Sequence, residues 1–254
     1  KFSVIIGGAI SSTALPIVPI INNKKVVLFS PAATSPKLAG SSPYFFRNWP
    51  SDVYDGTAMG EFAAKDLALK RVAVLHVNNE WGIAISNIFV ENFTKGGGKV
   101  VQTEMFDQNS TDFRTQLSKI NKSKPDAIFI PGYLKELIGI LRQKKELGIK
   151  STVLSAYGFY DPKIIELAKD AAECAIFTSP IYDSENSDPL VKEYVDGFQK
   201  EYSEKPDIWS AQAYDAFNII AAVIGEHKET GPEIRSGLTQ VKNFKGITGL
   251  TSFD

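Results

Sequence analysis

The sequence is poor in the residues that metal centres and many catalytic sites use. Its 254 residues include one cysteine, Cys174, and two histidines, His76 and His227. A single cysteine excludes a disulfide within the chain, and no cysteine–histidine cluster is present to bind zinc. His76 lies inside an apolar segment, which favours a core role over that of a base. His227 follows a predicted helix, where a cation suits the helix dipole.

Long apolar runs and a charge excess are also lacking. No stretch approaches the ~20 apolar residues that a membrane helix needs. No signal peptide is visible, so an exported protein would have lost its signal before this numbering begins. Lysine and arginine number 28 against 29 acidic residues, a formal net charge of −1. This balance argues against a nucleic-acid partner, because phosphate binding requires a basic surplus.

Motifs of common catalysts are missing as well. The sequence has neither a G-x-S-x-G nucleophile elbow nor a Walker phosphate loop. Its one glycine run, at 96–98, follows a predicted helix and precedes a strand, whereas a dinucleotide-binding loop has the opposite order. We interpret the run as a helix stop with a left-handed turn. The sequence therefore predicts no enzyme, cofactor or metal, although carboxylates brought together by folding remain an open alternative.

Short apolar runs alternate with helical patterns along the chain. Most of these runs are apolar without alternation in polarity, which is typical of parallel strands covered by helices on both faces. The fold class is therefore α/β, with parallel sheets flanked by helices. The predicted strands are 3–6, 26–29, 72–77, 100–105, 127–130, 153–156 and 175–178. The predicted helices are 56–69, one capped by Thr111, 134–147 with a stop at Gly148, 191–202 and 210–226.

Two loops after strands carry hydroxyls and small residues. Ile10, Ser11, Ser12 and Thr13 follow the first strand and open a helix, whose N-terminal N–H groups favour an anion. Simple capping by serine or threonine is the alternative. Residues 29–36 follow the next strand, either as an approach to a ligand or as a serine-proline turn. Together the two loops are suited to converge on one carboxylate.

Several motifs resemble the leucine/isoleucine/valine-binding proteins of ABC transporters. The resemblance is carried by Ile-Ile-Gly-Gly-Ala-Ile-Ser-Ser at 5–12, Ser-Pro-Ala-Ala-Thr-Ser-Pro at 30–36 and Tyr-Phe-Phe-Arg at 44–47. It continues through Lys-Pro-Asp-Ala-Ile-Phe at 124–129, Tyr-Asp-Ala at 214–216 and Gly-Leu-Thr-Ser-Phe-Asp at 249–254. It covers nearly the whole chain and is most specific in the first fifty residues.

The resemblance implies a two-lobed fold of the periplasmic-binding-protein type I class. The first lobe is expected at 1–49 and 180–254, and the second at 50–179. The crossings between them are expected at 48–52 and 178–182, each with a proline. Relative to the family, the chain is expected to be truncated at both ends, which would leave the first lobe incomplete.

The resemblance also implies a function and a set of binding residues. We expect an extracytoplasmic solute-binding protein that captures a branched-chain amino acid or small carboxylate between closing lobes and delivers it to ABC permease subunits. Its location would be periplasmic or extracellular, lipid-anchored in a Gram-positive cell. Hydroxyls and N–H groups would take the carboxylate and aromatic faces the hydrocarbon. The expected ligand-binding residues are Ile10, Ser11, Ser12, Ala32, Ala33, Thr34, Trp81, Tyr133, Tyr157 and Trp209. For Trp209 a core role is an equal alternative.

The sequence departs from the family pattern at one position. Tyr157 stands where amino-acid-binding members carry the acid that pairs with the ligand ammonium. A buried ammonium without a carboxylate is costly. Either the ligand lacks an α-amine, as a keto acid or aromatic carboxylate does, or Asp161 or Asp183 substitutes. A second functional class, the ligand-sensing ectodomain of a signalling receptor, uses the same fold and remains an alternative.

Overall fold

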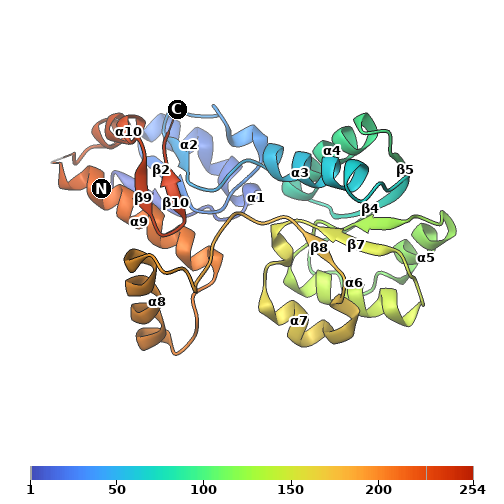
Figure 1. Ribbon diagram of the computed structural model, residues 1–254. Coiled ribbons are helices and arrows are strands. Elements are labelled where there is room, and N and C mark those ends of the chain that lie inside the picture. Colours follow the sequence, from blue (N-terminus) through green and yellow to red (C-terminus); the bar gives the residue numbers. More distant parts are fainter. Residues whose placement is uncertain (1, 227, 254) are drawn as a thin grey trace. The chain divides into compact units, whose positions relative to one another are not determined.

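A computed structural model describes residues 2–226 and 228–253. Lys1, His227 and Asp254 lie outside the described residues, and so does the interpretation of His227 as a helix-end cation. The chain divides into two units (Figure 1). Unit 1 consists of Lys1–Pro50 with Pro180–Asp254, and unit 2 of Ser51–Ser179.

Unit 2 is built on a five-stranded parallel sheet in the order β5-β4-β6-β7-β8. Residues Val72 to Leu75 of β4 are wholly buried, as expected for a strand with helices on both faces. Its strands are β4 (Arg71–Val77), β5 (Lys99–Phe106), β6 (Ala127–Phe129), β7 (Thr152–Ser155) and β8 (Ile176–Phe177). Its α-helices are α3 (Asp52–Lys65), α4 (Glu80–Lys95), α5 (Arg114–Lys122), α6 (Leu134–Glu146) and α7 (Pro162–Ala168).

Helices α3 and α4 pack together through small residues. A Cβ atom added at Gly60 would lie 2.9 Å from Asn92 Cβ and 2.9 Å from the backbone oxygen of Phe89. One turn earlier, a Cβ atom at Gly56 would lie 2.8 Å from Ile88 Cγ2. These positions advance together along both helices, so the helices run parallel. Glycine at these positions allows the two backbones to approach closely.

The predicted cap of α5 is wrong. The helix begins at Arg114 with Phe113 as its N-cap residue, and no side chain caps it. Gln143 of α6 holds the preceding loop instead: its Oε1 accepts a hydrogen bond from Phe113 N at 2.7 Å, and its Nε2 donates to Thr111 O at 2.8 Å. A buried amide from a neighbouring helix thus takes the role that the sequence suggested for the Thr111 hydroxyl.

Unit 1 contains a three-stranded parallel sheet in the order β1-β2-β3 and an antiparallel pair, β9 and β10. Its strands are β1 (Val4–Ile6), β2 (Val27–Ser30), β3 (Phe45–Arg47), β9 (Phe244–Gly246) and β10 (Gly249–Thr251). Its α-helices are α1 (Ser11–Ala14), α2 (Val18–Lys24), α8 (Pro189–Tyr202), α9 (Ile208–Gly225) and α10 (Gly231–Gln240).

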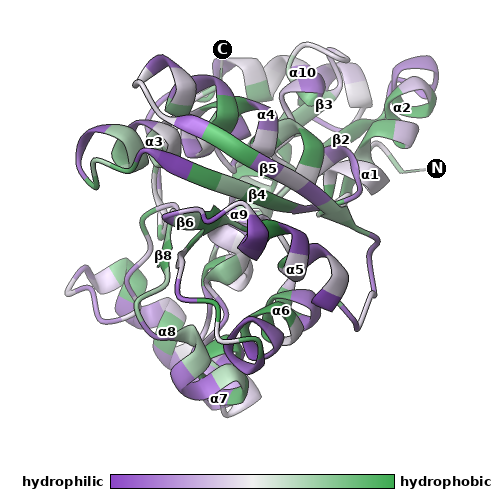
Figure 2. Cartoon of the chain, turned by 90° about the vertical axis from the view of Figure 1, so that its right-hand side faces the viewer, coloured by the Kyte–Doolittle hydropathy of each residue, from purple (hydrophilic) through white to green (hydrophobic). Residues whose placement is uncertain are grey.

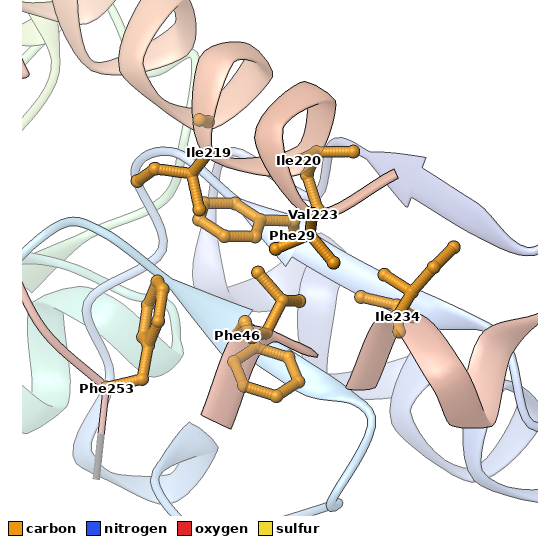
Figure 3. Packing of buried hydrophobic residues seen from close by; sticks show 10 residues of the cluster. Phe29, Phe46, Ile219, Ile220, Val223, Ile234 and Phe253 are labelled. Carbon is orange, nitrogen blue, oxygen red and sulfur yellow. The ribbon is translucent and has the colours of Figure 1, made fainter. Parts of the chain in front are cut away.

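The core of unit 1 lies between the sheet and helices α9 and α10 (Figure 3). Phe253 packs edge-to-face against Phe29 and Phe46, with ring centroids 5.7 and 5.4 Å apart. Isoleucine and valine side chains of α9, together with Ile234 of α10, pack against the same cluster. Segments from both ends of the chain thereby share one core.

Asp215 of α9 anchors the β9–β10 hairpin. Its carboxylate, 1% exposed, accepts hydrogen bonds from Ile247 N at 2.9 Å, Thr248 N at 2.8 Å and Thr248 Oγ1 at 2.5 Å. Both hairpin strands are short, and an isolated two-stranded hairpin is only marginally stable in water. A buried carboxylate on the helix therefore fixes this turn.

Every strand predicted from the sequence is present, with each end within one residue of the prediction. The glycine-run prediction is also confirmed, since α4 ends at Lys95 and Gly97 has a φ of +89°. The strands β3, β9 and β10 were not predicted. The helices carry hydrophilic as well as hydrophobic residues (Figure 2). Within residues 2–226 and 228–253, no helix combines the length and apolarity needed to cross a membrane.

Candidate functional site

The strand order of unit 2 defines where a ligand is expected. The chain passes from β4 outward to β5, then returns across β4 to β6 and continues to β7 and β8. In open parallel sheets, ligands bind at the carboxyl ends of the strands where this order reverses. That position lies between the ends of β4 and β6. The segments that follow these two strands carry Trp81 and Tyr133.

Three aromatic side chains meet at these strand ends. Trp81 follows β4, Tyr133 follows β6 and Tyr157 follows β7, the next strand in the sheet. The rings of Trp81 and Tyr133 are stacked with centroids 5.0 Å apart, and Tyr157 lies 5.4 Å from Trp81 in a tilted arrangement. We call Trp81, Tyr133 and Tyr157 the aromatic cluster. All three were predicted as ligand-binding residues, and the structure brings them together.

Local chemistry holds Trp81 and Tyr133 in place. Asn79 caps α4, its Oδ1 accepting from Gly82 N at 2.9 Å, and its Nδ2 donates to Tyr133 OH at 3.1 Å. A Cβ atom at Gly82 would lie only 2.2 Å from Val77 O, so the tight turn from β4 into α4 requires glycine. Burial raises the pKa of Tyr133, while the Asn79 hydrogen bond lowers it. The phenol therefore stays protonated at neutral pH.

Two acids that the sequence analysis did not single out lie close to the aromatic cluster. Asp52, the first residue of α3, is fully buried, and its Oδ1 accepts a hydrogen bond from Trp81 Nε1 at 3.2 Å. A carboxylate in the first turn of a helix is stabilised by the dipole. The only sequence signal was the position of these acids after Pro50-Ser51, which is equally typical of an ordinary helix start.

Asp55 lies in the same first turn as Asp52. Burial raises the pKa of Asp55 from 3.8 to about 6, while the Thr178 hydroxyl and the backbone N–H of Tyr157 act in the lowering direction. The Thr178 hydroxyl lies near this carboxyl but forms no hydrogen bond of normal geometry with it. Among the described residues, neither Asp55 Oδ2 nor Thr178 Oγ1 has a hydrogen-bond partner. Asp55 is thus an acid that titrates close to neutrality beside the backbone of Tyr157.

The two acids suggested as substitutes for Tyr157 have local roles. Asp161 caps α7, with Oδ1 accepting from Lys163 N at 2.9 Å. Asp183 Oδ1 accepts from Glu185 N at 2.9 Å. Both bonds lie within short turns. Asp52 is the acid whose carboxylate accepts a hydrogen bond from a ring of the aromatic cluster.

In unit 1, the capping interpretation of residues 10–13 is wrong. The N-cap of α1 is Ile10, and no side chain caps the helix. Ser11 is 2% exposed, and its Oγ accepts a hydrogen bond from Ser35 N at 3.1 Å. Ser12 is exposed, and so is Thr13, whose Oγ1 donates to Ile10 O at 2.8 Å. No described residue accepts the Ser11 hydroxyl proton, which leaves Ser11 a buried donor.

The loop after β2 is bonded to the loop after β1 and to β3. Ser30 Oγ donates to Gly8 O at 2.9 Å and accepts from Ala33 N at 3.0 Å and, more weakly, from Ala32 N at 3.4 Å. The N–H groups of both alanines are therefore used within the loop. Ala32, Ala33 and Thr34 are all buried. The structure thus brings Ser11 and residues 30–35 together as one largely buried polar group of unit 1.

Trp209 takes part in a ring stack within unit 1. Its ring lies 4.5 Å from that of Trp49 with an interplanar angle of 17°. Trp49 is 3% exposed, whereas Trp209, the second residue of α9, keeps part of its surface accessible. Trp209 is therefore a partly packed ring, and its place in ligand binding stays a prediction.

The described residues show no metal centre. Among residues 2–226 and 228–253, no group of three or more histidine, cysteine, aspartate or glutamate side chains is placed to hold an ion. His76 Nδ1 lies 2.9 Å from Val77 O at the end of β4. What the two units offer at their strand ends is a buried hydroxyl donor, aromatic faces and a buried carboxylate, which is the chemistry of a small-molecule binding surface.

A parallel α/β architecture with such surfaces at its strand ends defines a class of ligand-binding proteins, and comparison with known proteins identifies the family. The family model described as "Periplasmic binding protein" matches residues 1–254. The chain belongs to this family. The predicted resemblance and fold class are both confirmed.

Individual relatives agree with this assignment. The leucine-, isoleucine-, valine-, threonine- and alanine-binding protein of Pseudomonas aeruginosa is 28% identical over 251 residues, which cover 98% of this chain and 67% of that protein. The Leu/Ile/Val/Thr-binding protein of Salmonella typhimurium is 25% identical, and 65% of its length is covered. The chain thus spans about two thirds of the length of these relatives.

Solved structures show the same likeness. A leucine-binding protein from Thermotoga maritima is 32% identical with a TM-score of 0.92, over 99% of this chain and 72% of that one. A branched-chain amino acid transporter substrate-binding protein from Streptococcus pneumoniae, in complex with isoleucine, is 28% identical with a TM-score of 0.89, over the same shares of both chains.

Proposed function

We propose that this chain is the solute-binding component of an ABC transporter, working outside the cytoplasm. Its ligand is a small carboxylate of the branched-chain amino acid class, and it delivers this ligand to permease subunits in the membrane. We take the two units as the two lobes expected from the family resemblance, and we propose candidate ligand-binding residues in each unit. The proposal involves binding and release, with no covalent step.

The observation that carries the proposal is the aromatic cluster at the carboxyl ends of β4, β6 and β7. Three rings, from the separate segments that follow these strands, meet beside the point where the strand order reverses. Trp81 and Tyr157 are 2% and 6% exposed, and a group of aromatic faces of this kind suits a hydrocarbon side chain. The relatives from Thermotoga maritima and Streptococcus pneumoniae are described as leucine-binding and isoleucine-bound, which agrees with a branched hydrocarbon.

Ser11 supplies the complementary polar chemistry. Its oxygen already accepts the Ser35 N–H, so its proton is left to donate. A hydroxyl that donates to a carboxylate forms a charge-assisted hydrogen bond, stronger than one between neutral groups. Ser11 is therefore the residue to which we assign the first contact with the ligand carboxylate.

Asp52 provides a buried carboxylate in place of the acid that was expected at position 157. A ligand ammonium needs a carboxylate when it is taken out of water, and Asp52 is the buried carboxylate in contact with Trp81. We assign the ligand amine to this acid, so that an α-amino acid is accepted although Tyr157 replaces the family's acidic residue. An amine-free carboxylate is the competing ligand class.

A thermal-shift screen tests the proposal. The ligands are leucine, isoleucine and valine, their 2-keto acids, and a set of aromatic carboxylates. A ligand at a hundredfold over its dissociation constant adds about 2.7 kcal/mol of stability. We expect the amino acids to raise the melting temperature. A shift by amine-free acids alone would remove the branched-chain assignment and the role of Asp52 but keep the binding-protein assignment. No shift with any ligand would refute the proposal.

Adjacent serines provide a matched pair of variants. We expect Ser11→Ala to weaken leucine binding roughly 10- to 100-fold, since a hydrogen bond to a charged group contributes about 1.5–3 kcal/mol. Ser12→Ala should leave affinity unchanged, because Ser12 is exposed. Calorimetric titration of both variants measures the difference. Equal losses in the two variants would contradict the role assigned to Ser11.

A further inference from the structure

Arg47 binds the loop that carries Thr34. It ends β3 and pairs in register with Ser30, the last residue of β2. Its Nη1 donates hydrogen bonds to Ala33 O at 3.2 Å and to Ser35 O at 3.0 Å. The side chain therefore binds the backbone carbonyls of the residues before and after Thr34.

These bonds determine how the Thr34 backbone is oriented. In a trans peptide unit, the carbonyl and the following N–H point in opposite directions. Because Ala33 O faces Arg47, the N–H of Thr34 is directed away from the guanidinium. One guanidinium nitrogen thus fixes the direction of a donor in the loop after β2.

The guanidinium is also linked to Ser11 through a single residue. Ser35 donates its N–H to Ser11 Oγ and accepts a hydrogen bond from Arg47 at its carbonyl. The arginine carries a permanent positive charge, and a half-buried charge is screened by solvent less than an exposed one. An anion bound by the Ser11 hydroxyl would therefore lie in the field of this charge.

We propose that Arg47 is a positioning residue that makes the site prefer carboxylates over neutral analogues. It acts in two ways: it orients the Ala33–Thr34 peptide, and it places a positive charge behind residues 30–35. The inference rests on the proposed function and adds to it the group that sets the preference. The alternative is that Arg47 only stabilises the loop.

Two probes that differ only at the carboxylate separate these possibilities. L-Leucine and L-leucinamide share the side chain and the amine, and both are titrated calorimetrically at a pH where both amines are protonated. Wild type is expected to bind leucine more tightly. Arg47→Met should weaken leucine roughly 10- to 100-fold and leucinamide less than about threefold, since each tenfold corresponds to about 1.4 kcal/mol.

Arg47→Lys separates charge from geometry. Lysine keeps the charge but lacks the planar fork, so we expect it to retain part of the preference for leucine. Arg71→Met is the matched control. Arg71 also bonds two backbone carbonyls, with Nη2 to Ser123 O at 2.6 Å and Nε to Lys124 O at 3.3 Å, but at an exposed position in unit 2. Its loss should leave the leucine-to-leucinamide ratio unchanged.

Each outcome decides the inference. A leucine-to-leucinamide affinity ratio that falls in Arg47→Met and persists in Arg71→Met supports the positioning role of Arg47. Equal weakening of both probes in Arg47→Met, or an unchanged ratio, would show a purely structural role and overturn the inference while the proposed function stands. A wild-type chain that binds leucinamide as well as leucine also overturns it. Wild type that binds neither probe overturns the inference together with the branched-chain ligand assignment.

Discussion

The indole N–H of Trp81 donates a hydrogen bond to the buried carboxylate of Asp52 at 3.2 Å. The bond joins the first turns of α3 and α4, and it ties an aromatic face to a negative charge. We expect Asp52→Ala to lower the free energy of unfolding by about 1–3 kcal/mol, because the buried indole N–H loses its acceptor. Urea denaturation measures this loss.

Asp52→Asn separates the structural role from the binding role. The asparagine side-chain oxygen can still accept from Trp81, so stability should change little. Binding of leucine should nevertheless weaken, because the negative charge opposite the ammonium is lost. Unchanged leucine affinity in a stable Asp52→Asn chain would show that the amine is held elsewhere.

Asp55 should make stability depend on pH. Its pKa rises from 3.8 to about 6 because the carboxyl is buried. Between these values the folded chain binds more protons than the unfolded chain, so stability falls as pH increases. The full effect corresponds to roughly 3 kcal/mol. It is complete above pH 6, so the acid destabilises the folded chain at neutral pH.

Asp55→Asn removes this dependence, because the amide does not titrate. We expect the variant to be more stable than wild type at pH 7.5 and to lose that advantage at pH 4. Chemical denaturation at the two pH values tests this. A variant that is less stable than wild type at pH 7.5 would mean that the ionised carboxylate makes favourable contacts in the folded chain.

Two helical glycines should respond oppositely to alanine. Gly60→Ala places a Cβ atom 2.9 Å from Asn92 Cβ, so α3 and α4 must separate, at a cost of about 1–3 kcal/mol. Gly197 of α8 has nothing within 4 Å of an added Cβ atom, and Gly197→Ala should stabilise by about 0.5–1 kcal/mol through helix propensity. Melting temperatures of the two variants should shift in opposite directions, and a shared direction would contradict the proposed close packing.

The hairpin of unit 1 should depend on Asp215. Asp215→Ala leaves three buried or half-buried donors without their acceptor, and we expect a loss of about 3 kcal/mol or more. Thr248→Val removes one of these bonds and should cost about 1 kcal/mol. Urea denaturation ranks the two variants. Equal effects would show that the threonine hydroxyl alone accounts for the anchoring.

The fold was largely predictable because most of its strands are apolar runs, although β5 contains Gln102 and Glu104 and is partly exposed. Parallel strands between helices have no solvent face, so runs such as 72–77 are visible without any tertiary information. The strand β3 was missed because its apolar run ends after Phe45 and Phe46 at the charged Arg47. The strands β9 and β10 were also missed, and their turn depends on the carboxylate of Asp215, a residue distant in sequence.

The candidate site was predictable only in part. Trp81, Tyr133 and Tyr157 stood out as aromatic residues after strands, and family resemblance assigned them a role. Arg47 and Asp52 did not stand out, because their partners come from other elements of the fold. Likewise, Ser11 looked like a helix cap until its oxygen was found to accept from Ser35, which lies 24 positions away. Such pairings depend on tertiary structure and leave no local pattern.

The aromatic cluster is assembled from three separate segments that follow β4, β6 and β7, on a sheet whose hydrogen bonds involve none of the three rings. Each ring can therefore be exchanged by a single codon change without disturbing strand register. Under the proposed function, such an arrangement lets ligand preference diverge step by step while the scaffold is inherited intact.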